Sequence, residues 1–392
     1  MRSKDETLLA CQRELFDIPA EVVYLNCATM GPQLRAAVEA GHAAVRAGAA
    51  PWRLTSADWF ADSERLRSLA ARVIGTDTDS VALVPSVSYG IAVAAANVRV
   101  ERGQTIVVLD QQFPSNVYAW RELARARGAE IRTVRRGLTE GWTAPLLEAI
   151  EPRTALVAVP NCHWSDGGRV DLERVAERAR AVGAALVIDA SQSLGVCPLD
   201  LAAVQPDFVV SVGYKWLLGP YSLCYLYAAP RWQREGRPIE QPWINRAGAE
   251  NFSTLADYRD EFRPGARRFD MGQCSQFSTV PIAIAALEQM LAWGAERIAR
   301  TLTPLTQLAA RRAGELGGVV LAEPYRVGHL LGVRLEGLSA AAAHGGIGSA
   351  LAREGVYVSV RGDYVRIAPH VYSEAADIER LFSALRKLLA RG

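Results

Sequence analysis

Residues 209–227, VVSVGYKWLLGPYSLCYLY, begin as an apolar run typical of a buried strand, and the charged residue Lys215 interrupts the run before Trp216 and Leu217 resume it. A lysine at a strand end has two interpretations. Its stem can lie on apolar surface while the ammonium group reaches water. Alternatively, partial desolvation can turn the amine into a nucleophile that forms a Schiff base with an aldehyde. The residues around this stretch decide between the two.

Short β-rich runs alternate with helical stretches on both sides of Lys215. Two of the helical stretches, 115–128 and 171–183, each close with a glycine in the manner of a helix C-cap. This alternation predicts an α/β fold with a mostly parallel central sheet and helices on both faces. The predicted strands are SVALVPS (80–86), TIVVLD (105–110), EIRTVRR (130–136), ALVAVPN (155–161), ALVIDAS (185–191), FVVSVG (208–213) and LCYLYAA (223–229).

The pattern changes near Pro281, where a long helical stretch (281–316), interrupted near Pro304, precedes mixed strands and helices. We expect a large domain at 21–280, which carries the site, and a small α+β C-terminal domain at 281–392. Residues 1–20, with a helix around 4–15, are expected to pack on the small domain.

Composition and charge narrow the class of protein. The chain has 44 basic and 42 acidic residues, for a net charge of +2, without a concentrated charge run, which argues against nucleic acid or a membrane surface as a partner. No run reaches the ~18 apolar residues of a membrane span, and the charged N-terminal stretch does not resemble a signal peptide. We therefore expect a cytoplasmic protein. The six cysteines contain no CxxC pair, so we expect no metal site.

The residues that end the predicted strands share one chemistry, because ligands of parallel sheets bind beyond the carboxyl ends of the strands. Ser86 and Ser88 open a helix that can bind a phosphate, and Phe113 can stack on a flat heterocycle. Asp189 can hold a proton on a ring nitrogen, and Lys215 can bond to an aldehyde. Each residue alone has a simpler interpretation as a cap, a core residue or a surface charge. Together they predict a pyridoxal 5'-phosphate site.

The motifs LVIDASQSLG (186–195) and SVGYKWLLGP (211–220), with the lysine 26 residues after the aspartate, resemble the class V aminotransferase family of fold-type I pyridoxal phosphate enzymes. That family includes cysteine desulfurases, kynureninases and isopenicillin N epimerase-like proteins. The resemblance extends from YLNCATMGP (24–32) to the C-terminal helix. It implies that Lys215 forms the Schiff base and moves protons at the substrate Cα, and that Asp189 pairs with the pyridinium nitrogen.

The resemblance also assigns the remaining cofactor contacts. Gln192 corresponds to the residue that hydrogen-bonds the phenolic oxygen of the ring, and Phe113 is similar to the stacking phenylalanine of kynureninases. The phosphate cradle is expected from Val87 through its backbone, Ser88 and Tyr214.

Substrate and partner contacts follow from the same resemblance. Arg366 is expected to hold the substrate α-carboxylate, with Arg361 as a weaker candidate, and Asn26 lines the mouth of the site. His163 is expected as a wall of the substrate pocket or as a packed histidine. The segment RRFDMGQCSQF (267–277) implies a homodimer with shared sites, in which Gln273 completes the phosphate site of the neighbouring subunit; Trp243 is a further candidate to reach across.

Several reactions remain open. No cysteine lies beyond Cys274, where cysteine desulfurases carry their nucleophile, so persulfide chemistry is disfavoured. Phe113 and Tyr214 favour a kynureninase-like or cysteine-conjugate β-lyase that acts on an α-amino acid through an external aldimine. The alternatives are a class V aminotransferase, an epimerase, a decarboxylating or oxidatively deaminating enzyme on an S-cysteinyl conjugate, and a non-catalytic protein of this fold. A G-x-G-x-x-G dinucleotide turn and a P-loop are both absent from the sequence.

Overall fold

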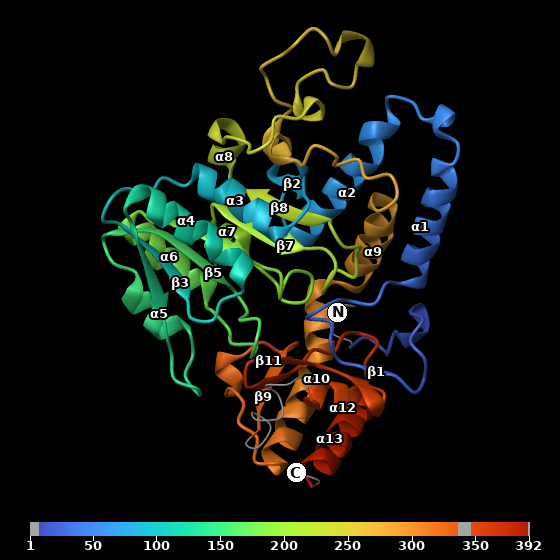
Figure 1. Ribbon diagram of the computed structural model, residues 1–392, viewed down its shortest axis with the longest axis vertical. Coiled ribbons are helices and arrows are strands. Elements are labelled where there is room, and N and C mark those ends of the chain that lie inside the picture. Colours follow the sequence, from blue (N-terminus) through green and yellow to red (C-terminus); the bar gives the residue numbers. More distant parts are fainter. Residues whose placement is uncertain (1–7, 336–345, 391–392) are drawn as a thin grey trace, which may run out of the picture.

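The structure is a computed structural model that describes residues 8–335 and 346–390. A seven-stranded sheet forms its centre (Figure 1), and the strand order is β2-β8-β7-β6-β5-β3-β4. β3 to β7 are parallel, whereas β8 is antiparallel to both of its neighbours. The predicted α/β class and the mostly parallel sheet are therefore confirmed. The strands are β2 Val81–Val84, β3 Thr105–Leu109, β4 Glu130–Val134, β5 Thr154–Pro160, β6 Ala185–Asp189, β7 Phe208–Val212 and β8 Cys224–Ala228.

Helices cover both faces of this sheet because successive strand residues point to opposite faces. Leu186 and Ile188 of β6 pack into the core that includes α2, α6 and α9, whereas Val187 packs into the core beneath α3 and α4. The helices of the large domain are α1 Arg35–Gly48, α2 Asp58–Ile74, α3 Val87–Asn97, α4 Tyr118–Arg127, α5 Thr143–Ala149, α6 Leu172–Val182, α7 Leu201–Val204, α8 Pro230–Glu235 and α9 Val280–Trp293.

The C-terminal part has a core of its own, in which a three-stranded antiparallel sheet packs with three helices. Its elements are α10 Ala295–Glu315, β9 Leu331–Arg334, α12 Gly346–Arg353, β10 Val356–Tyr357, β11 Ser359–Arg361, β12 Tyr364–Ile367 and α13 Ala375–Leu389. The N-terminal strand β1, Val23–Tyr24, pairs with β10. Residues 23–24 thus lie with the C-terminal elements, although they were expected within the large domain.

The structure differs from three further expectations. The long helix breaks at Gly294, which has a φ of 80°, and not at Pro304, which lies inside α10. α9 packs on α1 and α2 of the large domain, whereas α10 packs on α13 of the C-terminal part. These contacts favour a domain boundary at Gly294 over the expected boundary at 280. The N-terminal helix expected around residues 4–15 begins outside the described residues, and the described part contains only a 3-10 turn, Arg13–Leu15.

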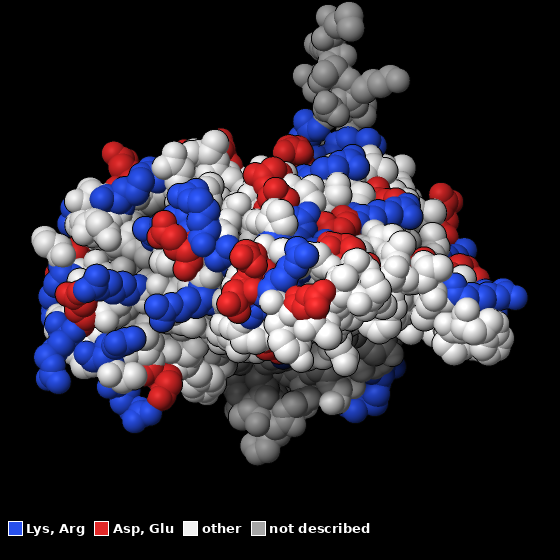
Figure 2. All heavy atoms as spheres, turned by 90° about the horizontal axis from the view of Figure 1, so that it is seen from above, with Lys and Arg blue, Asp and Glu red and all other residues white. Residues whose placement is uncertain are grey.

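The described surface mixes both signs of charge. Figure 2 shows basic and acidic side chains interspersed over the face seen from above. No described helix is long and apolar enough to cross a membrane.

Candidate active site

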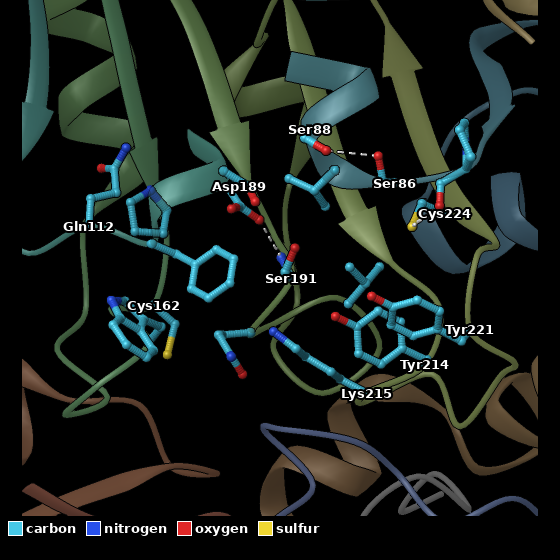
Figure 3. A pocket seen from close by; sticks show the side chains of 18 of the residues that line it. Ser86, Ser88, Gln112, Cys162, Asp189, Ser191, Tyr214, Lys215, Tyr221 and Cys224 are labelled. Atoms are coloured by element: carbon cyan, nitrogen blue, oxygen red, sulfur yellow. Dashed lines mark hydrogen bonds between the residues drawn. The ribbon is translucent and has the colours of Figure 1, made fainter. Parts of the chain in front are cut away.

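A cavity of about 420 Å³ lies beyond the carboxyl ends of β5, β6 and β7, at the N-terminus of α3 (Figure 3). Parallel strands place their carboxyl ends along one edge of the sheet, so residues far apart in sequence meet there. The predicted cofactor residues that line this cavity are Val87, Ser88, Phe113, Asp189, Gln192, Tyr214 and Lys215.

Lys215 enters the cavity from the loop after β7, and this loop is held tightly by the N-terminal segment. The Gly31 amide donates to the Tyr214 carbonyl at 2.8 Å. A Cβ at Gly31 would lie 2.3 Å from the Lys215 carbonyl oxygen, so only glycine permits this approach. Lys215 is 6% exposed, and burial lowers the pKa of its amine to about 8, against the opposing effect of Asp189. About a tenth of this amine is therefore neutral at pH 7, far more than for an ordinary lysine.

Asp189 is the last residue of β6, and its carboxylate is buried in the same cavity. It accepts a hydrogen bond of 3.0 Å from the Ser191 amide. Burial raises the pKa of this carboxyl group, while Ser191 and Lys215 oppose the rise. Figure 3 shows the Asp189 and Lys215 side chains reaching the cavity from different sides. A cationic ring nitrogen beside Asp189 would supply the partner that a buried carboxylate requires.

The N-terminus of α3 forms the polar end of the cavity. Ser86 caps this helix by accepting from the Tyr89 amide at 3.1 Å, and its hydroxyl lies 2.9 Å from that of Ser88. The first amides of a helix have no acceptor within the helix, and the helix dipole favours an anion there. The α3 N-terminus, the two serines and the nearby Tyr214 therefore suit a phosphate group.

The aromatic wall of the cavity consists of Phe113 and Trp164, whose rings meet edge to face at 5.4 Å. The Lys215 Nζ lies 5.3 Å from the centre of the Phe113 ring. Trp164 was not predicted, and it is fixed by its indole N–H, which donates to the Gln111 carbonyl at 2.7 Å. Its place directly after a predicted strand was the available signal.

Gln192 keeps hydrogen-bonding capacity for a ligand although its amide is held in place. Its Nε2 donates to the Ala28 carbonyl at 3.0 Å, and its Oε1 accepts from the Trp216 indole at 2.9 Å. Nε2 carries two hydrogens, so one N–H remains for a cofactor oxygen.

His163 is not a lining residue of this cavity, so of its two expected places the contacts match the packed histidine and not the pocket wall. Its ring stacks on Trp142 at 5.0 Å, and its nitrogens bond to the Ser165 hydroxyl and to the Asp110 carbonyl. These partners satisfy the imidazole, and its neighbours Cys162 and Trp164 form the wall instead.

Neither Arg361 nor Arg366 is a lining residue of this cavity, but both lie beside Trp164, which lines it. Arg366 is 1% exposed and donates to the Trp164 carbonyl and to the Thr29 hydroxyl, at 2.8 and 2.7 Å. Arg361 donates to the same hydroxyl at 3.2 Å. Thr29 was not predicted individually, although it belongs to the quoted loop 24–32.

The remaining predicted residues lie outside the lining of this cavity. The Asn26 side-chain oxygen is buried without a hydrogen-bond partner among the described residues. Gln273 is exposed, and Trp243 packs against Trp59 and Phe252. The roles proposed for Gln273 and Trp243 across a dimer interface stay predictions.

The loop in which a nucleophilic cysteine was sought is a tight turn. β11 and β12 are joined by Gly362 and Asp363 alone, and Gly362 has a φ of 55°. Two residues leave no space for an extended catalytic loop.

Comparisons with known proteins agree with this geometry. A family model described as "Aminotransferase class-V" matches residues 53–381. Isopenicillin N epimerase of Streptomyces clavuligerus is 28% identical over 94% of this chain and 95% of its own. Kynureninase of Deinococcus radiodurans is 28% identical over 67% of this chain and 64% of its own. The fold also matches C-DES, solved with glycine covalently linked to its PLP cofactor, with a TM-score of 0.83 and 20% identity over 95% of this chain and 98% of that one.

Proposed function

The chain belongs to the class V aminotransferase family and is a pyridoxal phosphate-dependent enzyme, and from this premise we propose that it is a β-lyase acting on an α-amino acid. The cofactor supplies the electron sink for charge released at the substrate Cα. The burial of Lys215, with a pKa of about 8, in the cavity that also holds Asp189 supports removal of a proton from Cα, the first step of an elimination.

This chain's residues have distinct tasks in the proposed reaction. The Lys215 amine takes the proton from Cα, a transfer suited to a base whose pKa is near the working pH. The Arg366 guanidinium holds the α-carboxylate, because a planar donor can form two parallel hydrogen bonds to it. Asp189 would pair with the ring nitrogen of the cofactor, and Phe113 would stack on its ring, since both side chains line the cavity.

Elimination balances without an added oxidant. Loss of the Cα proton and cleavage of the bond from Cβ to sulfur release a thiol. One water molecule then converts the remaining three-carbon unit into pyruvate and ammonium.

The ionisable groups of the cavity support elimination over epimerisation, which requires a second base on the opposite face of the substrate. Burial raises the pKa of Cys162 well above its usual value and raises the pKa of Cys224 and of Tyr214 to about 12. These three groups stay protonated near neutral pH and therefore act poorly as bases.

The test is incubation of the holoenzyme with S-substituted cysteines and with L-kynurenine. Pyruvate and a thiol formed without an amino acceptor support the lyase, as does anthranilate with alanine from kynurenine. Product formation that depends on an added keto acid indicates an aminotransferase instead. Inversion at Cα without a released fragment indicates an epimerase, and either result overturns the proposal.

We also propose that the enzyme is a homodimer. Tyr258 is 95% exposed and Trp52 is 79% exposed, and aromatic side chains of this kind are common at interfaces. Light scattering after size exclusion tests the oligomeric state. A cytoplasmic location stays a prediction.

A further inference from the structure

We propose that the substrate carries a second carboxylate in addition to its α-carboxylate, and that Arg361 is the residue that selects it. This inference rests on the proposed function, because it concerns the amino acid bound beside Lys215. The evidence is a pair of neighbouring arginines, the buried Arg366 and the half-buried Arg361, without a carboxylate partner among the described residues.

The two arginines project from the same face of the small sheet. The antiparallel register of β11 and β12 pairs Ser359 with Arg366 and Arg361 with Tyr364, so these side chains share a face. Arg361 and Arg366 converge on one acceptor, the Thr29 hydroxyl, and each guanidinium carbon lies 6.0 Å from the Trp164 ring centre. Two cations thus lie side by side next to Trp164, a lining residue of the cavity.

Their partners are all neutral. Arg366 donates to the Ser359 and Thr29 hydroxyls and to the Trp164 carbonyl, and Arg361 donates to the Val360 carbonyl and to Thr29. Neither forms an ion pair with any carboxylate in residues 8–335 and 346–390. Burial, together with the neighbouring charge of Arg361, lowers the pKa of Arg366 to about 9.

Two other arginines with buried side chains do have carboxylate partners. Arg67, which is fully buried, pairs with Asp270 at 2.7 Å, and Arg136 pairs with Asp166. Uncompensated buried charge is costly. The contrast indicates that an anion from outside the chain completes the site of Arg366, and the half-buried Arg361 beside it adds a second positive charge for an anionic ligand.

One α-carboxylate compensates only one guanidinium. Both arginines also lower the pKa of Lys215, so both charges act on the position where the amino acid reacts. A substrate with a second carboxylate at the end of its side chain would compensate Arg361 while its α-carboxylate binds Arg366. The matching class for a β-lyase is a cysteine conjugate whose sulfur substituent ends in a carboxylate.

The experiment compares acids with amides of the same shape. S-carboxymethyl-L-cysteine is matched with S-carbamoylmethyl-L-cysteine, and L-glutamate with L-glutamine. Absorbance changes of the bound cofactor give an apparent Kd for each ligand, and pyruvate release gives kcat/KM for the two conjugates. We expect the wild-type holoenzyme to prefer each acid by about tenfold or more, the size of one charge-assisted pair.

Variants assign this preference to a residue. Arg361→Gln should reduce the ratio of acid to amide to near one, and Arg361→Lys should restore part of it. Arg334→Gln is the matched control, because Arg334 lies on β9 of the same sheet and pairs with Asp363 at 3.5 Å; this variant should keep the wild-type ratio. Thermal unfolding confirms that each variant is folded.

Two results overturn the inference: a wild-type enzyme that binds acids and amides equally, and an Arg361→Gln variant that keeps the preference. The proposed function fails separately. If the acids bind preferentially through Arg361 but no conjugate yields pyruvate, the substrate class stands and the lyase reaction does not. If amide and acid conjugates both yield pyruvate at equal rates and bind equally, the lyase stands and the substrate class does not.

Discussion

Replacing Lys215 by methionine should stabilise the cofactor-free protein while abolishing catalysis. Methionine has a similar length and carries no charge, so the variant removes the cost of burying an ammonium group. Burial lowers the pKa of Lys215 from 10.5 to about 8, a difference that corresponds to ~3 kcal/mol at 1.36 kcal/mol for each pKa unit.

The sign follows from proton binding. Below pH 8 the penalty is fully present, because the unfolded chain holds the lysine proton more tightly than the folded chain does. Between about pH 8 and 10.5 the folded lysine has lost its proton while the unfolded lysine still carries it, so the stability of the wild type rises with pH. The advantage of Lys215→Met should therefore be ~3 kcal/mol at pH 7 and less than ~1 kcal/mol at pH 10.

Guanidinium unfolding of both cofactor-free proteins at several pH values measures this difference. Lys387→Met is the control, because the Lys387 side chain is 58% exposed; its effect should stay within ~0.5 kcal/mol at every pH. A Lys215→Met variant that is no more stable than the wild type at pH 7, or whose advantage does not change with pH, would refute the burial argument.

Three further predictions concern the surroundings of Lys215 and the core. Asp189→Asn should still bind the cofactor but slow deuterium exchange at the substrate Cα by ~100-fold or more, measured by NMR, because a preorganised charge is lost; an unchanged rate would remove Asp189 from the mechanism. Gly31→Ala should lower the unfolding temperature and weaken cofactor binding, since its Cβ would meet the Lys215 carbonyl. Gly48→Ala, where a Cβ meets nothing within 4 Å, should leave both measurements at or above wild type. Arg67→Met should destabilise the protein by ~3–5 kcal/mol, because Asp270 would keep a buried charge without its partner, and adding Asp270→Asn should recover part of the loss; a small effect of the single variant would contradict the importance of this pair.

The sequence predicted the strands of the large sheet closely because each is a short apolar run bounded by turn residues. The prediction failed in the long helix, because the rule that proline breaks a helix takes no account of the solvent exposure of the proline. Pro304 was expected to break the helix, but it is exposed within α10, where a carbonyl that loses its N–H partner can face water. Gly294 breaks the helix instead through its positive φ.

The site shows a similar division between local and long-range information. Residues directly after a strand, such as Asp189 and Lys215, were predictable because the sheet brings strand ends together. Thr29 meets Arg361 across more than 300 positions of sequence, a contact that no local pattern records. Asp189 is the last residue of a strand and lines the cavity, whereas His163 comes shortly after a strand and packs on Trp142 instead. The direction of a side chain in a loop depends on its packing partners, and the order of residues along the chain does not show which residues those partners are.

The charges around the cavity connect the catalytic and the specificity arguments. Lys215, Arg361 and Arg366 are three cations near a single lining carboxylate, Asp189, and burial lowers the pKa of all three cations. Covalent attachment of the cofactor would remove the charge of Lys215, and the α-carboxylate of an amino acid would offset Arg366. Arg361 would then remain without an anionic partner among the described residues, and a second anionic group on the substrate would supply one. A neutral substrate side chain would not form this ion pair, and for that reason the preference for acid over amide should disappear in Arg361→Gln but persist in Arg334→Gln.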